Sequence, residues 1–466
     1  MRATLASTVA MVAMAAAGVA QAAQIGSVSR LAFGPAGADG TSTLFVADWA
    51  QSTVHALTLP PARPDAGQPF NVRDLDTPLR AALGTGDVTL EDISARPGSD
   101  EVYVAVTTGA TKDVAIVAVR ADGSVRKLDL GMLADTTAPL DNAPDAALTF
   151  WDNIPGRSFT VTDMKWHEGK LYLAGLSNQS FASSLRIIPY PFGHGAGIAS
   201  VEMYHTSHNQ METRAPIRAM AFTELDGKPF LLAAYLCTPL VTIPLESLRD
   251  GAHVTGKTIA ELGDAGTPAD IVPYTAMNFA TGKPEAYVLV ANQFRESSII
   301  PLSSVAEANR GPGFSKPVPF GQVVGVQRMG TVMSTVMRVD DQDAEFLVAL
   351  RRDLPTGHAQ LVSINKAATF RLSDYDVSEY LFPDYRYTAP MQANFIKPMQ
   401  NMLKKSEGFA DQVRPRNVHC PVGRRSRPAP RLHSQAWSDG YGERARRPSA
   451  RRSTPTPIRS WPAIRA

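Results

Sequence analysis

The sequence predicts an all-β fold, a β-propeller made of a repeated blade. A short apolar strand recurs at a nearly constant interval, shorter strands flank each copy, and no helical periodicity separates the copies. The second residues of successive copies are 58, 69, 59, 57 and 59 positions apart. A unit of three or four short strands, repeated six times, is typical of a propeller, whose blades stack face to face. The copies are residues 44–47 (LFVA), 102–105 (VYVA), 171–174 (LYLA), 230–233 (FLLA), 287–290 (YVLV) and 346–349 (FLVA).

Each copy has companions at matching offsets. An upstream strand is expected around residues 91–93, 162–164 and 269–271, and a downstream strand around 185–189, 241–244 and 299–301. A sandwich of sheets would explain short strands but not the even period, so the propeller is the preferred interpretation.

The predicted propeller has six recognisable blades, which end near residue 374. Residues 375–410 contain no further copy of the apolar strand. Our hypothesis is therefore a fold with a seventh blade that is incomplete at the C-terminus.

The two ends of the chain differ from the body in composition. Residues 1–22 have a basic start, an apolar run and small residues at Ala20 and Ala22, as in a cleaved signal peptide. We expect the propeller to span 23–410 and to be periplasmic or secreted. No later stretch is long and apolar enough to suggest a membrane span.

Residues 411–466 contain 13 arginines, no lysine and three acids, and we expect them to be disordered. A shifted reading frame in a GC-rich gene would give such an Arg/Pro-rich tail, and a basic arm is the alternative. Residues 23–410 carry 32 basic and 41 acidic residues, a net charge of −9. This balance speaks against nucleic acid as a partner.

Propeller geometry predicts which polar residues meet at the mouth of the central channel. The innermost strand of each blade begins on the face where the loop between its second and third strands lies. We expect Asp92, Asp163, Arg218 and Asp270, with Arg30 and Thr335, at the starts of inner strands, and Asn178 and Asn292 in the loops. These residues are the predicted ligand-binding ring.

Two interpretations of this ring stay open. Carboxylate and amide oxygens suit a hard cation such as Ca²⁺. Alternatively, the acids pair with arginine and turn amides, as polar groups in narrow wet channels do.

The connection 193–217, which contains the segment 203–214 (MYHTSHNQMETR), offers a second candidate site. His205, His208 and Met211 are spaced three residues apart, and imidazole with thioether is a soft ligand set that suits copper. A surface loop with two satisfied histidines is the competing interpretation.

Several chemistries are excluded by missing motifs. The chain has no Cys-x-x-Cys-His for covalent haem, no Gly-x-Ser-x-Gly elbow and no phosphate-binding glycine loop. The cofactor therefore stays unknown, with calcium or copper as candidates, and the sequence does not decide whether the protein is an enzyme.

Four segments carry a resemblance: 175–186 (GLSNQSFASSLR), 188–192 (IPYPF), 212–218 (ETRAPIR) and 233–241 (AAYLCTPLV). They resemble an uncharacterised family of bacterial secreted propellers, and the strand at 44–52 is similar to NHL- and YVTN-type propellers. The resemblance implies a fold and a compartment, and no reaction.

The sequence predicts a propeller binding module that presents a loop face to a protein or small ligand. The alternative is a metal-dependent propeller enzyme, hydrolytic or redox, with its site at the channel mouth.

Overall fold

Each of the six apolar tetrapeptides lies in the second strand of a separate sheet. The structure, a computed structural model, describes residues 21–367, except 35, 65–66, 152, 194, 238, 264–265, 279–280, 320, 332 and 334, together with 389–391. Leu44, Phe45, Val46 and Ala47 are completely buried, as strands covered on both faces must be. The six second strands are β3 (Ser42–Asp48), β7 (Glu101–Thr108), β14 (Lys170–Leu176), β19 (Lys228–Ala234), β23 (Lys283–Asn292) and β28 (Phe346–Arg352).

The first strand of each sheet pairs antiparallel with the second, and we call these six the inner strands. The third strand follows the second in every sheet. The inner strands are β2 (Arg30–Phe33), β6 (Val88–Ala95), β13 (Asp163–His167), β18 (Ala219–Leu225), β22 (Pro268–Asn278) and β27 (Val336–Asp341). The third strands are β4 (Thr53–Leu59), β8 (Asp113–Arg120), β15 (Ser183–Pro189), β20 (Pro239–Pro244), β24 (Ser297–Pro301) and β29 (Ala359–Asn365).

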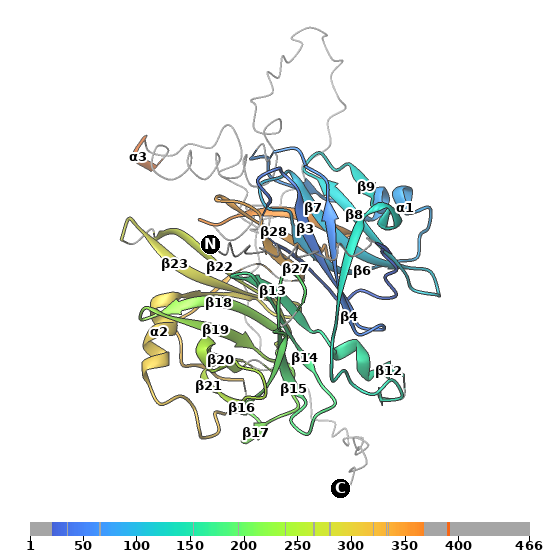
Figure 1. Ribbon diagram of the computed structural model, residues 1–466. Helices are drawn as coiled ribbons and strands as arrows, with labels where there is room; N and C mark the ends of the chain where they lie inside the picture. Colours follow the sequence, from blue (N-terminus) through green and yellow to red (C-terminus); the bar gives the residue numbers. More distant parts are fainter. Residues whose placement is uncertain are drawn as a thin grey trace, which may run out of the picture. The chain divides into compact units, whose positions relative to one another are not determined.

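The outer strands show how the sheets are joined. The succession β18, β19, β20, β21 can be followed in Figure 1. β16 and β21 pair in parallel and so fuse two of the sheets. The outer strands, in the order of the sheets, are β10 (Ala134–Pro139), β9 (Val125–Lys127), β16 (Gly197–His205), β21 (His253–Leu262), β26 (Met329–Thr331) and β5 (Asn71–Val72).

Minor elements decorate these sheets. Short strands β1 (Gln21–Ala22), β17 (Gln210–Glu212) and β25 (Val323–Val324) pair with β10, β16 and β21. The remaining elements are β11 (Thr149–Phe150), β12 (Ile154–Pro155), α1 (Asp76–Leu83), α2 (Leu302–Arg310), α3 (Ala389–Met391), η1 (Leu130–Met132), η2 (Gly156–Phe159) and η3 (Leu245–Ser247).

The inner strands contact one another in a ring whose order differs from chain order. Going round, β2 is followed by β6, β27, β22, β18 and β13, and β13 lies against β2 again. The sheet of β6 therefore lies between the first and the last sheets of the chain. The chain segments on either side of this sheet supply outer strands to its two neighbours. β5, just before β6, is the outer strand of the last sheet, and β10, just after β9, is the outer strand of the first sheet.

The hydrophobic core of the described residues consists of six clusters, one at each junction between neighbouring sheets. Val104 and Leu361 share the cluster between the second and last sheets, and Leu185 and Ala233 share the cluster between the third and fourth sheets. The other four clusters join the remaining neighbours in the same order as the ring contacts. The described part of the chain is thus all-β and propeller-like.

Some predictions fall outside the described residues. Apart from β1 and α3, the expected signal segment 1–22, the residues 375–410 expected for a seventh blade, and the tail 411–466 are not described. No helix in the described part of the chain combines the length and the hydropathy that crossing a bilayer requires.

Candidate functional site

The three predicted acids of the inner strands come together at the centre of the ring. Arg30 links two of them: its Nη1 lies 3.4 Å from Asp92 Oδ1 and its Nε 3.8 Å from Asp163 Oδ1. Lys165 Nζ lies 4.0 Å from Asp163 Oδ1 and 3.6 Å from Asp270 Oδ1. All three carboxylates are buried. The convergence expected from the spacing of the strands is therefore found in the structure.

Each of these carboxylates also accepts a backbone N–H from the inner strand of a neighbouring sheet. Asp92 Oδ2 accepts from Leu31 at 2.7 Å, on the neighbouring strand β2. Asp163 Oδ2 accepts from Met220 at 2.7 Å, on β18. Asp270 Oδ2 accepts the N–H of Val339, on β27, at 3.0 Å. The acids therefore tie the sheets together through charge-assisted hydrogen bonds.

Two residues of β27, Arg338 and Asp340, also belong to this cluster, and the sequence did not predict them. Arg338 Nε donates to Asp92 Oδ1 at 2.8 Å, and Asp340 Oδ2 accepts the N–H of Ala95 at 2.9 Å. A register shift between Val336 and Arg338 marks a β-bulge at the start of this strand. Corresponding register shifts precede Asp92 on β6 and Asp270 on β22, so the equivalent inward position on β27 is Arg338 rather than the predicted Thr335.

The charges in this cluster shift one another's protonation. Burial raises the pKa of Asp340 to about 6, even though Lys165 opposes the shift. Burial lowers the pKa of Lys165, but the carboxylates of Asp163 and Asp270 raise it by more, so the ammonium stays charged. Burial also raises the pKa of Asp92, against the two guanidinium groups of Arg30 and Arg338.

A cavity of about 410 Å³ lies on one side of the cluster. Phe33 and Trp166, near the ends of their inner strands, line it, as do Pro97 and Gly98 of the following turn. The acids thus face the end of the ring opposite to the predicted mouth. The charged lining residues are Asp92, Asp163, Lys165, Asp270, Asp340, Asp341 and Asp343.

A second cavity, of about 250 Å³, lies at the end where the inner strands begin. Arg30, Arg218 and Arg338 line it together with Glu91 and Trp49. Arg218 is therefore at the predicted mouth, but it faces other arginines rather than the acids. Burial lowers the pKa of Arg218 to about 10, and the positive charges of Arg30 and Arg338 lower it further than the acids raise it.

The two predicted asparagines do not line either cavity. Asn178 is exposed in the β14–β15 loop, and its backbone N–H donates to the Asn142 carbonyl at 2.9 Å. Asn292 is buried at the end of β23, where its Oδ1 accepts the N–H of Thr267 at 2.9 Å. Asn292 stabilises the local turn, because its side chain satisfies a backbone donor.

The contacts of the acids favour the structural interpretation of the ring over a calcium site. Ca²⁺ takes six to eight oxygen ligands, and several must be carboxylate or carbonyl oxygens with free lone pairs. Each carboxylate of Asp92, Asp163 and Asp270 already accepts at least one backbone N–H and faces a guanidinium or ammonium group. The groups are thus satisfied by the protein itself.

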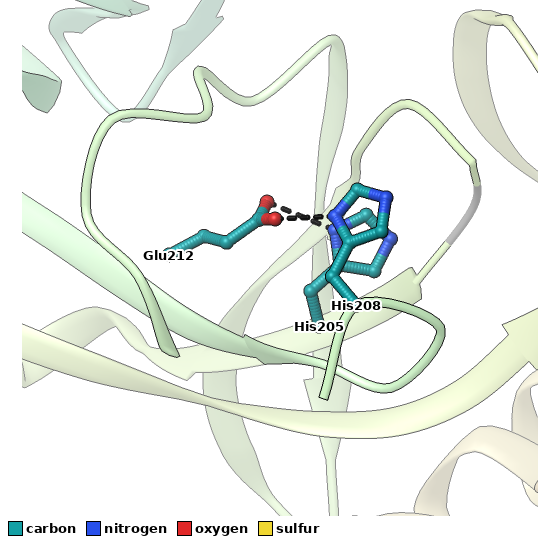
Figure 2. Close-up of side chains that lie close together, drawn as sticks. All are labelled: His205, His208 and Glu212. Atoms are coloured by element: carbon teal, nitrogen blue, oxygen red, sulfur yellow. Dashed lines mark hydrogen bonds and ion pairs between the residues drawn. The ribbon is translucent and has the colours of Figure 1, made fainter. Parts of the chain in front are cut away.

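The predicted histidines of the 203–214 connection do come together, on the β16–β17 hairpin. His205 Nδ1 lies 2.9 Å from Glu212 Oε2, and His208 Nδ1 lies 2.5 Å from Glu212 Oε1. Figure 2 shows the two imidazoles lying one above the other, with the carboxylate on the side of both Nδ1 atoms. Burial raises the pKa of Glu212, but hydrogen bonds with His205 and His208 outweigh it and bring the pKa to about 2.

Met211 was predicted as the third ligand, and the structure replaces it with Glu212. Side chains alternate between the two faces of a strand, so on β17 Glu212 faces the histidines and Met211 faces away. The helical-looking spacing of three was misleading, because this segment is a β-hairpin. The useful signal was the carboxylate four residues after His208.

Exposed apolar side chains mark the loops between the second and third strands. Phe181, Leu236, Phe294 and Leu354 occupy these loops in four different sheets, and all are exposed. The first residue of an inner strand pairs near the last residue of the second strand, as Asp163 does with Ala174. The loops therefore leave their sheets at the end where the inner strands begin, beside the second cavity.

No protein-family model matches the chain, and no curated protein matches its sequence. The solved structures similar to it include Drosophila Semaphorin 1b, extracellular domains 1–2, with a TM-score of 0.31 and 10% identity over 74% of this chain and 88% of that chain. Another is the quinohemoprotein alcohol dehydrogenase from Comamonas testosteroni, with a TM-score of 0.29 and 10% identity over 74% of this chain and 60% of that chain. At such scores no property of these proteins carries over to this chain.

Proposed function

We propose that this chain is a binding module, a propeller of six blades that presents one loop face to a partner protein. Two observations support six blades: each junction of the ring has its own hydrophobic cluster, and β27 lies directly against β6. A seventh blade between these two strands would have to separate them. On this proposal the sequence-based hypothesis of an incomplete seventh blade is not needed.

The observation that carries the binding function is the row of exposed apolar side chains on the second-to-third strand loops. Phe294 and Leu354 are 78% and 75% exposed, and Phe181 and Leu236 are also exposed. Trp151, at the tip of the β11–β12 hairpin, is 80% exposed. Large apolar groups that gather on one face of a protein mark an interaction site, whereas scattered ones need no explanation.

The chemistry of this face fits a protein partner. Aromatic side chains are enriched in protein–protein interfaces, because they contribute much contact area for little conformational entropy. The loops that carry these side chains are anchored at both ends by buried strands, so the face consists of loops on a rigid scaffold.

The experiment compares partner capture by two variants of the full chain. The first replaces Phe181, Leu236, Phe294 and Leu354 with serine. The control replaces Met132, Met277 and Met329, which are equally exposed but lie outside these loops, with serine. We expect wild type and control to retain the same protein from an extract of the native source and the loop variant to lose it. Equal capture by all three would refute the proposal.

A second candidate function is the binding of a small cationic ligand in the 410 Å³ cavity. The cavity has the volume of a small-ligand site. Its described lining includes six aspartates and a single cation, Lys165. Lys366 Nζ, which is not part of the lining, contacts the carboxylate of Asp341 and donates to the backbone carbonyl of Asp343. Calorimetric titration with putrescine is the direct test, and an absence of heat at millimolar concentrations would reject it.

We also propose that the partner is met outside the cytoplasm, as the signal-like segment 1–22 implies. N-terminal sequencing of the protein from a periplasmic fraction should begin at Ala23. An intact Met1 would reject export with cleavage.

A further inference from the structure

The β16–β17 hairpin brings together three side chains that can each donate a metal ligand. His205 and His208 each offer an imidazole nitrogen and Glu212 offers a carboxylate oxygen, and these atoms lie within 4.8 Å of one another. The hairpin register places His205 and Glu212 on the same face, because His205 pairs with Gln210 and Met203 pairs with Glu212. His208 lies in the turn that joins the two strands.

The separations suit a transition-metal ion. Zinc holds imidazole nitrogen and carboxylate oxygen at about 2.0–2.2 Å, which places neighbouring tetrahedral ligands roughly 3.3 Å apart. The N–O distances to Glu212 are 2.9 Å for His205 and 2.5 Å for His208. Each histidine nitrogen would have to move away from the Glu212 oxygen by less than about 1 Å to admit the ion.

Independent evidence comes from polar atoms around the cluster that the protein leaves unsatisfied. Among the described residues, His205 Nε2, Ser207 Oγ and Tyr235 Oη are buried and have no hydrogen-bond partner. His205 is only 2% exposed, and the phenol of Tyr235 lies within electrostatic range of the Glu212 carboxylate. Buried polar groups normally have partners, so this concentration of exceptions points to a ligand.

We propose that His205, His208 and Glu212 form a binding site for a divalent transition-metal ion of the zinc class. Two imidazoles and a carboxylate are the ligand types that zinc takes, with a further position left for water. His208 has about half of its side chain exposed, at 48%, which leaves that position open to solvent. Without the thioether of Met211, the soft set expected for copper is not present.

The other group of potential ligands lacks these features. Asp74, Asp76 and His358 also lie close together. The Asp74 carboxylate caps the turn at Thr77, and Asp76 Oδ2 accepts the N–H of Ala359. The hydrogen bonds of these acids account for their positions, so the group needs no metal ion.

The test uses the full chain without an affinity tag, treated with chelator and then titrated with Co²⁺ and Zn²⁺. We expect one Zn²⁺ per chain by calorimetry and, with Co²⁺, visible absorption bands of a low-coordinate site with nitrogen ligands. His208→Ala should weaken Zn²⁺ binding at least about 100-fold, because it removes an exposed ligand without disturbing the core. Glu212→Gln should weaken it as well.

Two controls separate this site from surface histidines. His253→Ala removes a half-exposed histidine that lies 3.4 Å from a single carboxylate, that of Glu202, and Met211→Ala removes the neighbour on the opposite face. Both should bind Zn²⁺ like the wild type. An absence of stoichiometric binding at micromolar Zn²⁺, or wild-type affinity in folded His208→Ala, would overturn the proposal.

Discussion

The carboxylate of Asp163 on β13 accepts the backbone N–H of Met220 on β18 at 2.7 Å, and so connects two neighbouring sheets at the centre of the ring. The same carboxylate accepts the N–H of Met164 at 2.8 Å and faces Arg30 and Lys165. Of the two interpretations that the sequence left open for this residue, a cation ligand or a partner of protein groups, these contacts favour the second.

Asp163→Ala should therefore lower the free energy of unfolding by about 3–5 kcal/mol, because it leaves the buried N–H of Met220 without an acceptor and removes one of the two carboxylates that face Arg30. Urea unfolding followed by far-UV circular dichroism measures the change. Asp113→Ala, which removes an exposed carboxylate, is the control and should change the free energy by less than about 0.5 kcal/mol. Equal effects of the two substitutions would contradict the structural role of Asp163.

His55 makes stability depend on pH. It lies on β4, is buried, and its Nδ1 is 2.8 Å from Asp135 Oδ2 on β10. Burial lowers the pKa of His55, but the Asp135 and Asp48 carboxylates raise it by more, to about 9. Because the folded pKa exceeds the unfolded value, the stabilisation is complete below pH 6.5 and is lost as pH rises through 9. The loss should amount to about 3 kcal/mol.

The measurement is the difference in unfolding free energy between wild type and His55→Gln across this pH range. The difference should shrink from pH 6.5 to pH 9.5. A difference that stays constant would show that the histidine does not gain a proton on folding.

Arg186 is a buried guanidinium that bonds to backbone oxygens. It lies on β15, and burial lowers its pKa to about 10. A lysine has three donors without the planar fork, so it cannot replace this set. Arg186→Lys should lower the unfolding free energy by about 3 kcal/mol in urea, whereas the exposed Arg80→Lys should change it little. The acceptors are the carbonyl oxygens of Asp141, Asn142, Thr160 and Leu176 and the Ser184 hydroxyl.

Lys165 is the cation that limits how well the central cavity would accept another positive charge. Lys165→Met should strengthen putrescine binding by about tenfold, since it removes a positive charge a few ångströms away. Calorimetry at pH 8.5 measures the change, because burial raises the pKa of Asp340 to about 6 against the opposing charge of Lys165, and loss of that charge raises it further. Lys228→Met, an exposed substitution on β19, should leave the affinity unchanged. Unchanged or weaker binding by the Lys165 variant would contradict this electrostatic effect.

The sequence predicted the local features of the sheets well. Even spacing and apolar content placed all six second strands, because strands buried on both faces must be apolar throughout. It also brought Asp92, Asp163 and Asp270 together, since each occupies an inner strand of its own sheet.

Features that depend on backbone irregularity or on distant pairing were not predictable. The inward position of β27 was expected at Thr335, three residues before Arg338, and the strand alternation on β17 exchanged Met211 for Glu212. The ring order was hidden as well, because β5 has two residues and carries no signal of its own. β5 forms a strand because it pairs with β29.

The placement of the second sheet between the first and the last has a consequence for synthesis of the chain. The sheet formed by residues 88–127 can pack against the first sheet early in synthesis. Its other face, which includes Val104 and Val106, packs against Leu350 and Leu361 of the last sheet. That face stays uncovered until residues some 250 positions later have been made. Contacts of such long range slow folding and leave apolar strands open to wrong partners. A nascent chain of this protein would need to shield that surface until β29 emerges.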